Sequence, residues 1–536
     1  MARNPRALVH LPAAFLAGLL ILTHSQCTPK LPRIPVTGAI EPLTAPFAMP
    51  QLARPSFPEA EFDIRDFGAI EGGTAKITGA IRDAIVAATH AGGGHVLIPP
   101  GTWLTGAIHL ESNIDLHLLR GAELLFSQDP ADYLPVVFSR HEDIECYKYS
   151  AFIYAEGKSN IAVTGEGVLN GQGKPWWAWK QAKRDAEKEL YAMGANNVPV
   201  AQRIFDGKGG LELRPAFFQP VSCSNVLVEG VTFLYGAFWT LTPTYCENVI
   251  IRNVHIETEG AYGHTPNGDG VDPSSCRNVL IEHCTFDTGD DCIAIKAGRD
   301  ADGLRVARPT ENVVIRHCQG LRGHGGIVIG SETSGGIRNI YAHDCQFTGT
   351  DRIVRIKTAR SRGGVLENLW FRTLVADTIE LEALHINMLY TGTRLPEAPV
   401  TKATPVIRNI HYSNITCKFA KGRAVEILGL PESLVESVTL DSITMHSARG
   451  IACSDARNIA FNSVSVTAES SPVVELTDCD RVSLNSILIP SGADPFLQVG
   501  GARSGGIVVR NSDVRNAKSV VRLGAGTSPQ AVSVQN

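Results

Sequence analysis

Three carboxylates lie in two glycine-flanked turns of the stretch 265–298. Asp269 belongs to NGDGVD (267–272), and Asp290 and Asp291 belong to TGDDCIAIK (288–296). Asp290 lies 21 residues after Asp269. If that interval is one turn of a coiled parallel sheet, the two acidic groups lie on neighbouring coils, about 5 Å apart. Crowded carboxyls repel, so we expect at least one of them to keep its proton to higher pH than a free Asp. One protonated and one ionised carboxyl are what acid/base cleavage of a glycosidic bond requires.

An imidazole and two cations follow these carboxylates at matching repeat positions. His324 lies 12 residues after a repeat asparagine, as Asp290 does, and Arg355 and Lys357 follow in the phrase RIVRIKT. The two cations are unsuited to bind zinc, but they suit a carboxylate on a substrate. Taken singly, the acidic pair could be a solvated turn or a calcium ligand, the histidine part of a turn, and the cations an outward strand face. Their alignment predicts one groove, acidic at one end and basic at the other.

A short phrase, an asparagine followed by alternating apolar residues, recurs along the chain, as in NVLVEGVTF, NVIIRNVHI and NVLIEHCTF. Its leading asparagines stand at 225, 248, 278, 312, 339, 368, 409 and 458. Spacings mostly between 21 and 34 residues are typical of a solenoid, and the period of two indicates strands with one buried face. No long helix intervenes, so the sequence predicts an all-β fold, a single right-handed parallel β-helix. We expect the asparagines to stack at a turn and to bond to neighbouring backbone.

The remaining segments are predicted to cap or decorate this solenoid, which we place at 59–536 as the catalytic domain. Residues 59–125 differ in texture and carry an amphipathic segment at 78–90, so we expect an N-terminal cap containing a helix, because an end coil otherwise exposes its core. Residues 174–214 break the repeat and are expected to form a helical insertion. Its Trp176, Trp177 and Trp179 could hold a sugar ring, but packing onto the coil is the favoured interpretation.

Cysteine usage favours reduced core thiols over disulfides and over a metal site. Six of the twelve cysteines occupy fixed repeat positions, and at one of these positions other repeats have valine. A cysteine that alternates with valine behaves as a small apolar side chain. This applies to Cys223, Cys246, Cys276, Cys284, Cys318 and Cys345.

The N-terminus and the composition indicate an exported protein. Residues 1–26 carry two arginines before an apolar run at 13–22, which is typical of a signal peptide and short for a bilayer span. The Pro-rich stretch 27–58 is predicted to be a linker, and Cys27 lacks the small preceding residue expected of a lipidated cysteine. With a net charge of −5 and 19% charged residues there is no nucleic-acid footprint. We expect a periplasmic or extracellular monomer without stable membrane insertion.

Four separated motifs resemble a known family. NGDGVD (267–272), TGDDCIAIK (288–296), GHGG (323–326) and RIK (355–357), in this order on β-helical repeats, look like the signature set of the polygalacturonases, the family 28 glycoside hydrolases. The flanking phrases GQGKPWW and CENVIIRNVHI look like the bacterial members. The resemblance covers about residues 62–468. One departure is Gly268, where many members have Thr, and we expect it to alter only the turn.

The resemblance implies an inverting hydrolase of α-1,4-linked galacturonan that needs neither a metal nor another cofactor. By matching motifs, Asp290 would be the general acid, Asp269 and Asp291 would activate the attacking water, and His324 would orient or tune the acid. The substrate's uronate carboxylate would be bound by Arg355 and Lys357, with a weaker carry-over for Tyr390 in NMLYTG.

Further expectations concern the shape of the groove and the alternative functions. The wide interval after Asp291 allows an added loop that closes one end and favours exo action, with Arg299, Arg305 and Arg308 as candidates to grip a chain end. Alternatives are a rhamnogalacturonan or xylogalacturonan hydrolase, a calcium-dependent pectate lyase, and a non-catalytic β-helix that binds glycans. We also expect Lys357→Ala to raise KM more than it affects folding, because the groove face is expected to be solvated.

Overall fold

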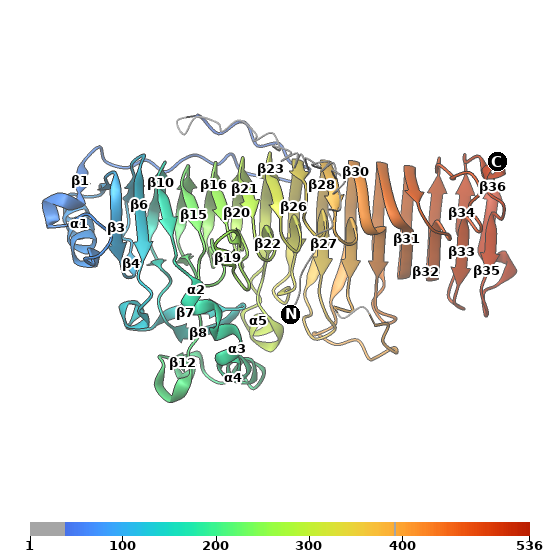
Figure 1. Ribbon diagram of the computed structural model, residues 1–536. Coiled ribbons are helices and arrows are strands. Elements are labelled where there is room, and N and C mark those ends of the chain that lie inside the picture. Colours follow the sequence, from blue (N-terminus) through green and yellow to red (C-terminus); the bar gives the residue numbers. More distant parts are fainter. Residues whose placement is uncertain (1–37, 391–392, 536) are drawn as a thin grey trace, which may run out of the picture. The chain divides into compact units, whose positions relative to one another are not determined.

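The computed structural model describes residues 38–390 and 393–535, and most of their strands stack in parallel along one axis (Figure 1). Three stacks run side by side, because each coil contributes up to three strands. The first stack consists of β2 (Gly94–Ile98), β5 (Ile114–Leu118), β10 (Ser159–Gly165), β14 (Ser224–Glu229), β16 (Glu247–Arg252), β20 (Arg277–Glu282), β23 (Thr310–Arg316), β26 (Ile337–Phe347), β28 (Val365–Ile379), β30 (Val406–Leu428), β31 (Val435–Ala468) and β32 (Val474–Asn485).

The second and third stacks complete the coils. The second consists of β3 (Gly101–Thr105), β6 (Ala122–Phe126), β11 (Val168–Asn170), β15 (Thr232–Leu234), β17 (His255–Glu257), β21 (Thr285–Asp287) and β24 (Gln319–Arg322). The third consists of β4 (Ile108–His109), β9 (Ile153–Glu156), β13 (Phe218–Val221), β22 (Ile293–Ile295), β25 (Ile327–Ile329), β27 (Val354–Lys357) and β29 (Leu384–Asn387). Isolated bridges at Leu241 and Val271 continue the third stack between β13 and β22. The final coils carry β33 (Leu497–Gly500), β34 (Ile507–Arg510), β35 (Val521–Leu523) and β36 (Val532–Gln535).

The core lies inside these coils, because alternate strand residues point inward. In β20 and β23 the inward positions are Val279, Ile281, Val313 and Ile315, all fully buried and in matching register. Burial of apolar surface along every coil is the main force that holds such a stack together. The predicted right-handed parallel β-helix is confirmed.

A helix covers the first coil, as predicted. α1 spans Thr78–His90 and buries Ala80, Ile81, Ala84, Ile85 and Ala88. It follows β1 (Glu61–Asp63), which pairs with β2. The coils already begin at β2, so the cap itself is shorter than the predicted range 59–125.

Residues 174–214 contain α2 (Lys174–Trp177), α3 (Trp179–Ala182), α4 (Arg184–Ala195) and the short strand β12 (Ile204–Phe205). Beside them lies the hairpin of β7 (Val137–His141) and β8 (Ile144–Lys148), and β12 pairs with β8. Trp176 is buried against Tyr133 and Trp179, with ring centroids 5.4 and 4.9 Å apart. Packing therefore accounts for Trp176, in agreement with the favoured interpretation.

Residues 38–58, part of the predicted linker, form an extended strap on the outer face of the first stack. Leu52 and its partly buried neighbours pack on outward side chains of five successive strands, among them Leu227, Ile250 and Leu280. Arg316 donates hydrogen bonds to backbone oxygens of Glu41 and Pro42 at 3.1 and 3.2 Å. This part of the chain is thus held on the sheet. The predicted signal peptide and Cys27 lie outside the described residues.

The repeat asparagines form a ladder, but not with the expected partners. From Asn160 to Asn409, each Nδ2 donates to the Oδ1 of the asparagine one coil earlier, at 2.6–3.3 Å. The expectation of bonds to backbone was wrong. Each asparagine is in the left-handed conformation, with φ of 58° at Asn312. Asparagine suits both demands, since it tolerates positive φ and carries a donor and an acceptor.

We expect Asn312→Ala to destabilise the protein by about 2–4 kcal/mol, because two ladder hydrogen bonds are lost and alanine is strained at positive φ. Asn312→Gly keeps the backbone conformation and loses only the hydrogen bonds, so it should cost about half as much. Urea unfolding of the wild type and the two variants measures the cost of the lost hydrogen bonds and the cost of the strained backbone separately. Equal stability of Asn312→Ala and wild type would contradict a stabilising ladder.

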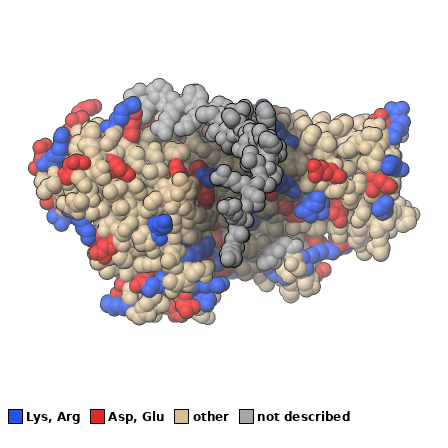
Figure 2. All heavy atoms as spheres, in the orientation of Figure 1, with Lys and Arg blue, Asp and Glu red and all other residues tan. Residues whose placement is uncertain are grey.

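Three further findings concern the cysteines, the lengths of the helices and the surface charges. All cysteines in the described part of the chain are buried and free, which confirms the expectation of core thiols. Across residues 38–390 and 393–535, no helix combines the length and apolar character needed to cross a bilayer. On the face seen in Figure 2, basic and acidic side chains are interspersed outside the grey atoms.

Candidate active site

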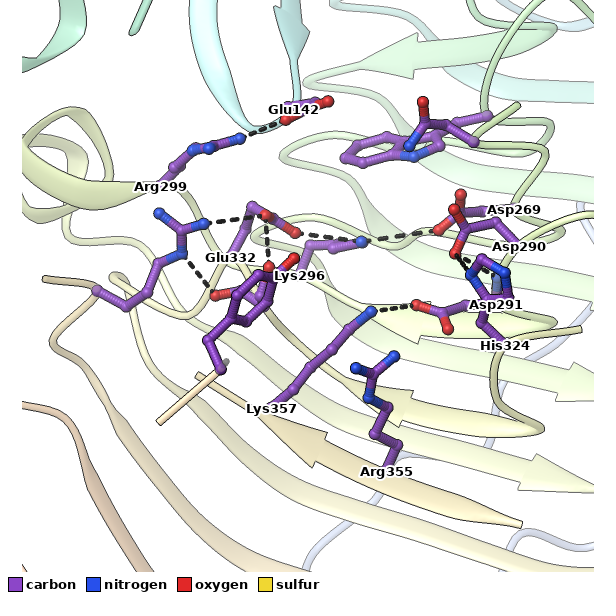
Figure 3. Close-up of a pocket in the computed structure, with 15 residues that line it drawn as sticks. Glu142, Asp269, Asp290, Asp291, Lys296, Arg299, His324, Glu332, Arg355 and Lys357 are labelled. Atoms are coloured by element: carbon purple, nitrogen blue, oxygen red, sulfur yellow. Dashed lines mark hydrogen bonds and ion pairs between the residues drawn. The ribbon is translucent and has the colours of Figure 1, made fainter. Parts of the chain in front are cut away.

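The three carboxylates converge at the turns that lead into the third stack. Asp269 lies two residues before Val271, and Asp290 and Asp291 lie just before β22, which pairs with Val271. One oxygen from each carboxylate lies within 4.8 Å of the others. The side chains of Asp269, Asp290 and Asp291 occupy the same side of the coil and point into one cavity (Figure 3). The spacing of 21 residues therefore corresponds to one coil.

The predicted imidazole and cations reach the same cavity from the next coils. His324 Nδ1 lies 3.0 Å from Asp290 Oδ1, and Lys357 Nζ donates to Asp291 Oδ2 at 2.7 Å. Arg355 lies on β27 beside Lys357, and Tyr390 is half-exposed. All seven residues predicted for the site line this cavity, which has a volume of about 380 Å³.

Lys357 departs from one expectation. Only 8% of the residue is exposed, and its ammonium group is paired with a carboxylate that is itself buried. The premise that its surroundings are solvated is wrong. A change at Lys357 must therefore affect the fold as well as substrate binding.

Seven residues of the cavity were not predicted as site residues. They are Lys296, Glu332, Trp239, Glu142, Asn267, Ser331 and Arg362. Lys296 Nζ lies 3.7 Å from Asp269 and 3.1 Å from Glu332, and it sits 4.5 Å from the centroid of the Trp239 ring. Lys296 ends the phrase TGDDCIAIK and directly follows a third-stack strand, while Lys357 ends another. That shared position was the signal available in the sequence. Glu332 and Trp239 lie outside the four motifs.

One side of the cavity is walled by segments that pack on the coils. Arg299, just before α5 (Asp300–Val306), forms an ion pair with Glu142 in the β7–β8 turn. Arg362 bonds to Asp300 at 2.6 Å and lies 3.6 Å from Glu332. These contacts fix α5 beside the cavity (Figure 3).

Of the three arginines expected to hold a chain end, one lines the cavity. Arg299 lines the cavity, whereas Arg305 is engaged by Glu145 and Asp302. Arg308 donates to the backbone oxygen of Tyr245 and lies over its ring. Arg305 and Arg308 therefore hold the α5 region in place instead of lining the cavity.

The surroundings of Asp269 and Asp290 shift the pKa values of the two carboxyls in opposite directions. Burial, followed by repulsion from Asp272 and Asp290, raises the pKa of Asp269 well above its usual value, against the attraction of Lys296. Burial also raises the pKa of Asp290, but the His324 hydrogen bond and the charge of Lys357 outweigh it and hold that pKa below its usual range. One crowded carboxyl, Asp269, therefore keeps its proton to higher pH than a free Asp, as predicted. Asp290, by contrast, ionises at lower pH than a free Asp in the unliganded site.

The hydrogen bond to Asp290 raises the pKa of His324, against the opposing effect of burial. The pair therefore stabilises the fold fully between about pH 4 and pH 6.5. Above this window its contribution is lost as pH rises through the raised pKa of His324, and below it as pH falls through the lowered pKa of Asp290. In Asp290→Asn, a neutral amide replaces the carboxylate that raises the His324 pKa, while burial still lowers that pKa. We therefore expect the His324 pKa to fall. NMR titration of the histidine ring protons, assigned with His324→Gln, measures it. An unchanged pKa would contradict this account.

Ammonium groups supply the counter-charge of the carboxylate cluster. Lys357 pairs with Asp291, and Lys296 lies 3.7 Å from both Asp269 and Asp272. Carboxylates grouped this closely can also hold a calcium ion. Here two buried cations already occupy that electrostatic role, so the cluster does not require a metal for charge balance.

A parallel β-helix that gathers carboxylates, a histidine and cations in one walled cavity defines the class, a carbohydrate-cleaving β-helix enzyme. Comparison with known proteins gives the family. Residues 138–466 match the glycosyl hydrolases family 28. The chain belongs to this family and is a glycoside hydrolase.

Individual relatives agree with this assignment. A probable polygalacturonase of Vitis vinifera is 29% identical over 418 residues, which are 76% of this chain and 78% of the relative. An exo-poly-alpha-D-galacturonosidase of Dickeya chrysanthemi is 27% identical over 442 residues, which are 75% of this chain and 71% of the relative. The crystal structure of a hyperthermoactive exopolygalacturonase from Thermotoga maritima is similar with a TM-score of 0.69 and 35% identity, covering 85% of this chain and 93% of that one.

Proposed function

We propose that the protein hydrolyses α-1,4-galacturonosidic bonds of polygalacturonate and releases sugar from a chain end. The observation that carries this proposal is the junction of a carboxylate cluster with Lys357 and Arg355 in one cavity. The carboxylates can cleave a glycosidic bond, and the cations can bind a uronate. The relatives named as polygalacturonases and exo-acting enzymes support the same substrate class.

In the proposed reaction, Asp290 protonates the glycosidic oxygen while water attacks the anomeric carbon. Asp269 and Asp291 activate that water: its proton passes to Asp291, the carboxylate paired with Lys357, while Asp269, which holds its own proton to higher pH, orients the water by a hydrogen bond. His324 holds the Asp290 carboxyl. This assignment needs Asp290 to gain a proton that the unliganded site disfavours. The cations near it provide a route, because a bound uronate carboxylate offsets the positive charge of Lys357 and thereby raises the pKa of Asp290. Protonated His324 is a nearby proton source.

Exo action is proposed from the wall of the cavity. The Arg299–Glu142 ion pair and the Arg362–Asp300 hydrogen bond join α5 to the neighbouring segments on one side. A polysaccharide threaded through the site would have to displace these partly buried contacts. A chain end can enter without doing so.

The stereochemical outcome is proposed from the family resemblance. Inverting enzymes typically separate their two carboxyl groups by about 6.5–9.5 Å, and retaining enzymes by about 5–5.5 Å. The oxygens here approach within 4.8 Å, so separation alone does not argue for inversion. Export, a monomeric state and the absence of nucleic-acid and membrane binding stay predictions.

Hydrolysis of a defined galacturonate oligomer tests the proposal. Chromatography should show short products from one end from the first turnovers, and proton NMR should show the β-anomer first. Mid-chain products would contradict exo action, and a first α-anomer would contradict inversion. Ultraviolet-absorbing products that need calcium would identify a lyase. Cleavage only of rhamnogalacturonan or xylogalacturonan would favour those alternatives.

A further inference from the structure

Arg214 joins the end of the helical insertion to the turn that carries Asp269. Its Nη1 donates to the backbone oxygen of Pro266 at 2.6 Å, and its Nη2 donates to Asn267 Oδ1 at 2.8 Å. The two acceptors are adjacent in the sequence and lie two and three residues before Asp269. A single guanidinium group therefore grips this turn at two points.

The guanidinium group is held rigidly. Arg214 is 2% exposed, and its guanidinium lies 4.8 Å from the centroid of the Phe238 ring and 3.7 Å from a Glu187 oxygen. Its backbone oxygen accepts a hydrogen bond from buried Lys148 at 2.8 Å. Burial lowers the pKa of Arg214, and Glu187 and Glu142 oppose that effect. Because the fork is planar and fully enclosed, its donors have fixed directions.

This contact determines which end of the Asn267 amide faces the cavity. A guanidinium can only donate, so the amide atom turned toward Arg214 must be the acceptor Oδ1. Asn267 lines the cavity, and in the described part of the chain no hydrogen bond engages its Nδ2. The amide thus has a donor left for an oxygen atom of a bound sugar.

We propose that Arg214 is a positioning residue that presents Asn267 Nδ2 to a hydroxyl or carboxylate oxygen of the uronic acid substrate and fixes the turn that bears Asp269. The helical insertion is then part of the substrate-binding apparatus, acting through this one side chain. The inference rests on the proposed function, because it names a sugar oxygen as the acceptor.

A double-mutant cycle tests the coupling on a galacturonate oligomer. Arg214→Met should lower kcat/KM about 100-fold, as expected when a reacting group is misplaced by about 1 Å. Asn267→Ala should lower it about 10-fold, the size of one hydrogen bond to a substrate. Because both act through the same amide, the double variant should match Arg214→Met alone. Effects that multiply would overturn the proposal.

Arg203→Met is the matched control for loss of a buried arginine. Arg203 is equally enclosed, and it bonds to Asp302 and the backbone oxygens of Glu145 and Val198 without contacting the turn. Its effect should multiply with that of Asn267→Ala. If adding Asn267→Ala to Arg203→Met lowered kcat/KM no further, as is expected for Arg214→Met, the coupling would reflect a general loss of structure. That result would overturn the proposal.

Asn267→Asp keeps the test decisive if Arg214→Met does not fold. The carboxylate still accepts from Arg214 but offers the cavity an acceptor in place of the donor. KM for the oligomer should rise at least about 10-fold while the unfolding temperature stays the same or rises. An unchanged KM would overturn the inference. If the wild type does not cleave galacturonan at all, the proposed function has failed instead.

Discussion

Asp290→Asn is expected to lower kcat on oligogalacturonate by about 10²–10⁴-fold, the range contributed by a positioned general acid. Asparagine retains an oxygen that can accept from His324, which bonds to this side chain at 3.0 Å. The cations that bind the substrate are also unaltered. We therefore expect the variant to bind the oligomer with near wild-type affinity in calorimetry, while turnover is lost.

Asp377→Asn provides the matched control, because Asp377 is a surface carboxylate paired with Lys418. It should leave kcat unchanged. If Asp290→Asn retained more than a tenth of wild-type kcat, the role of general acid would be wrong. If neither protein turned over substrate but both bound it equally, a glycan-binding module would be the better description.

Lys357→Ala is expected to lower kcat/KM by about 30- to 5,000-fold, because removing a buried charged partner costs about 2–5 kcal/mol. Most of this change should appear in KM, since the ammonium group is proposed to bind the uronate. The same variant should also be less stable by about 3–5 kcal/mol, because Asp291 is left buried without its ion pair. Steady-state kinetics and urea unfolding measure the two effects separately.

Lys421→Ala is the control for a lysine of the opposite kind, exposed and paired with Glu380 at the surface. Such pairs contribute about 0–1 kcal/mol, so neither kinetics nor stability should change appreciably. An unaltered KM in Lys357→Ala would remove the proposed carboxylate contact. An unaltered stability would show that the pair with Asp291 is not structural.

The coil architecture and the convergence of the site were predictable because both are encoded by local repeats. Counting from the repeat asparagines placed Asp290 and His324 at matching positions on successive coils, and the two side chains are hydrogen-bonded. The ladder partners were not predictable. An asparagine at a turn can bond to backbone or to another asparagine, and only the registration of neighbouring coils decides between them.

Features built by segments outside the repeats could not be derived in this way. The wall of the cavity depends on Arg299 meeting Glu142, which is 157 residues away in the sequence. The burial of Lys357 depends on the depth of the cavity, which strand periodicity does not specify. Lys296 was visible in a motif, but its role depends on Asp272 and Glu332 closing around it.

The strap of residues 38–58 runs across several coils, so its length must match the number of coils that it crosses. Phe47 packs on Trp370 of β28 and Phe57 packs on His95 of β2, with ring centroids 5.7 and 5.8 Å apart. A duplication that added one coil between these anchors would lengthen the face by about 5 Å, whereas an extended residue spans about 3.3 Å. Each added coil must therefore be matched by one or two extra residues upstream, or one aromatic anchor is lost. Growth of this solenoid by duplication is constrained by a segment that lies outside its repeats.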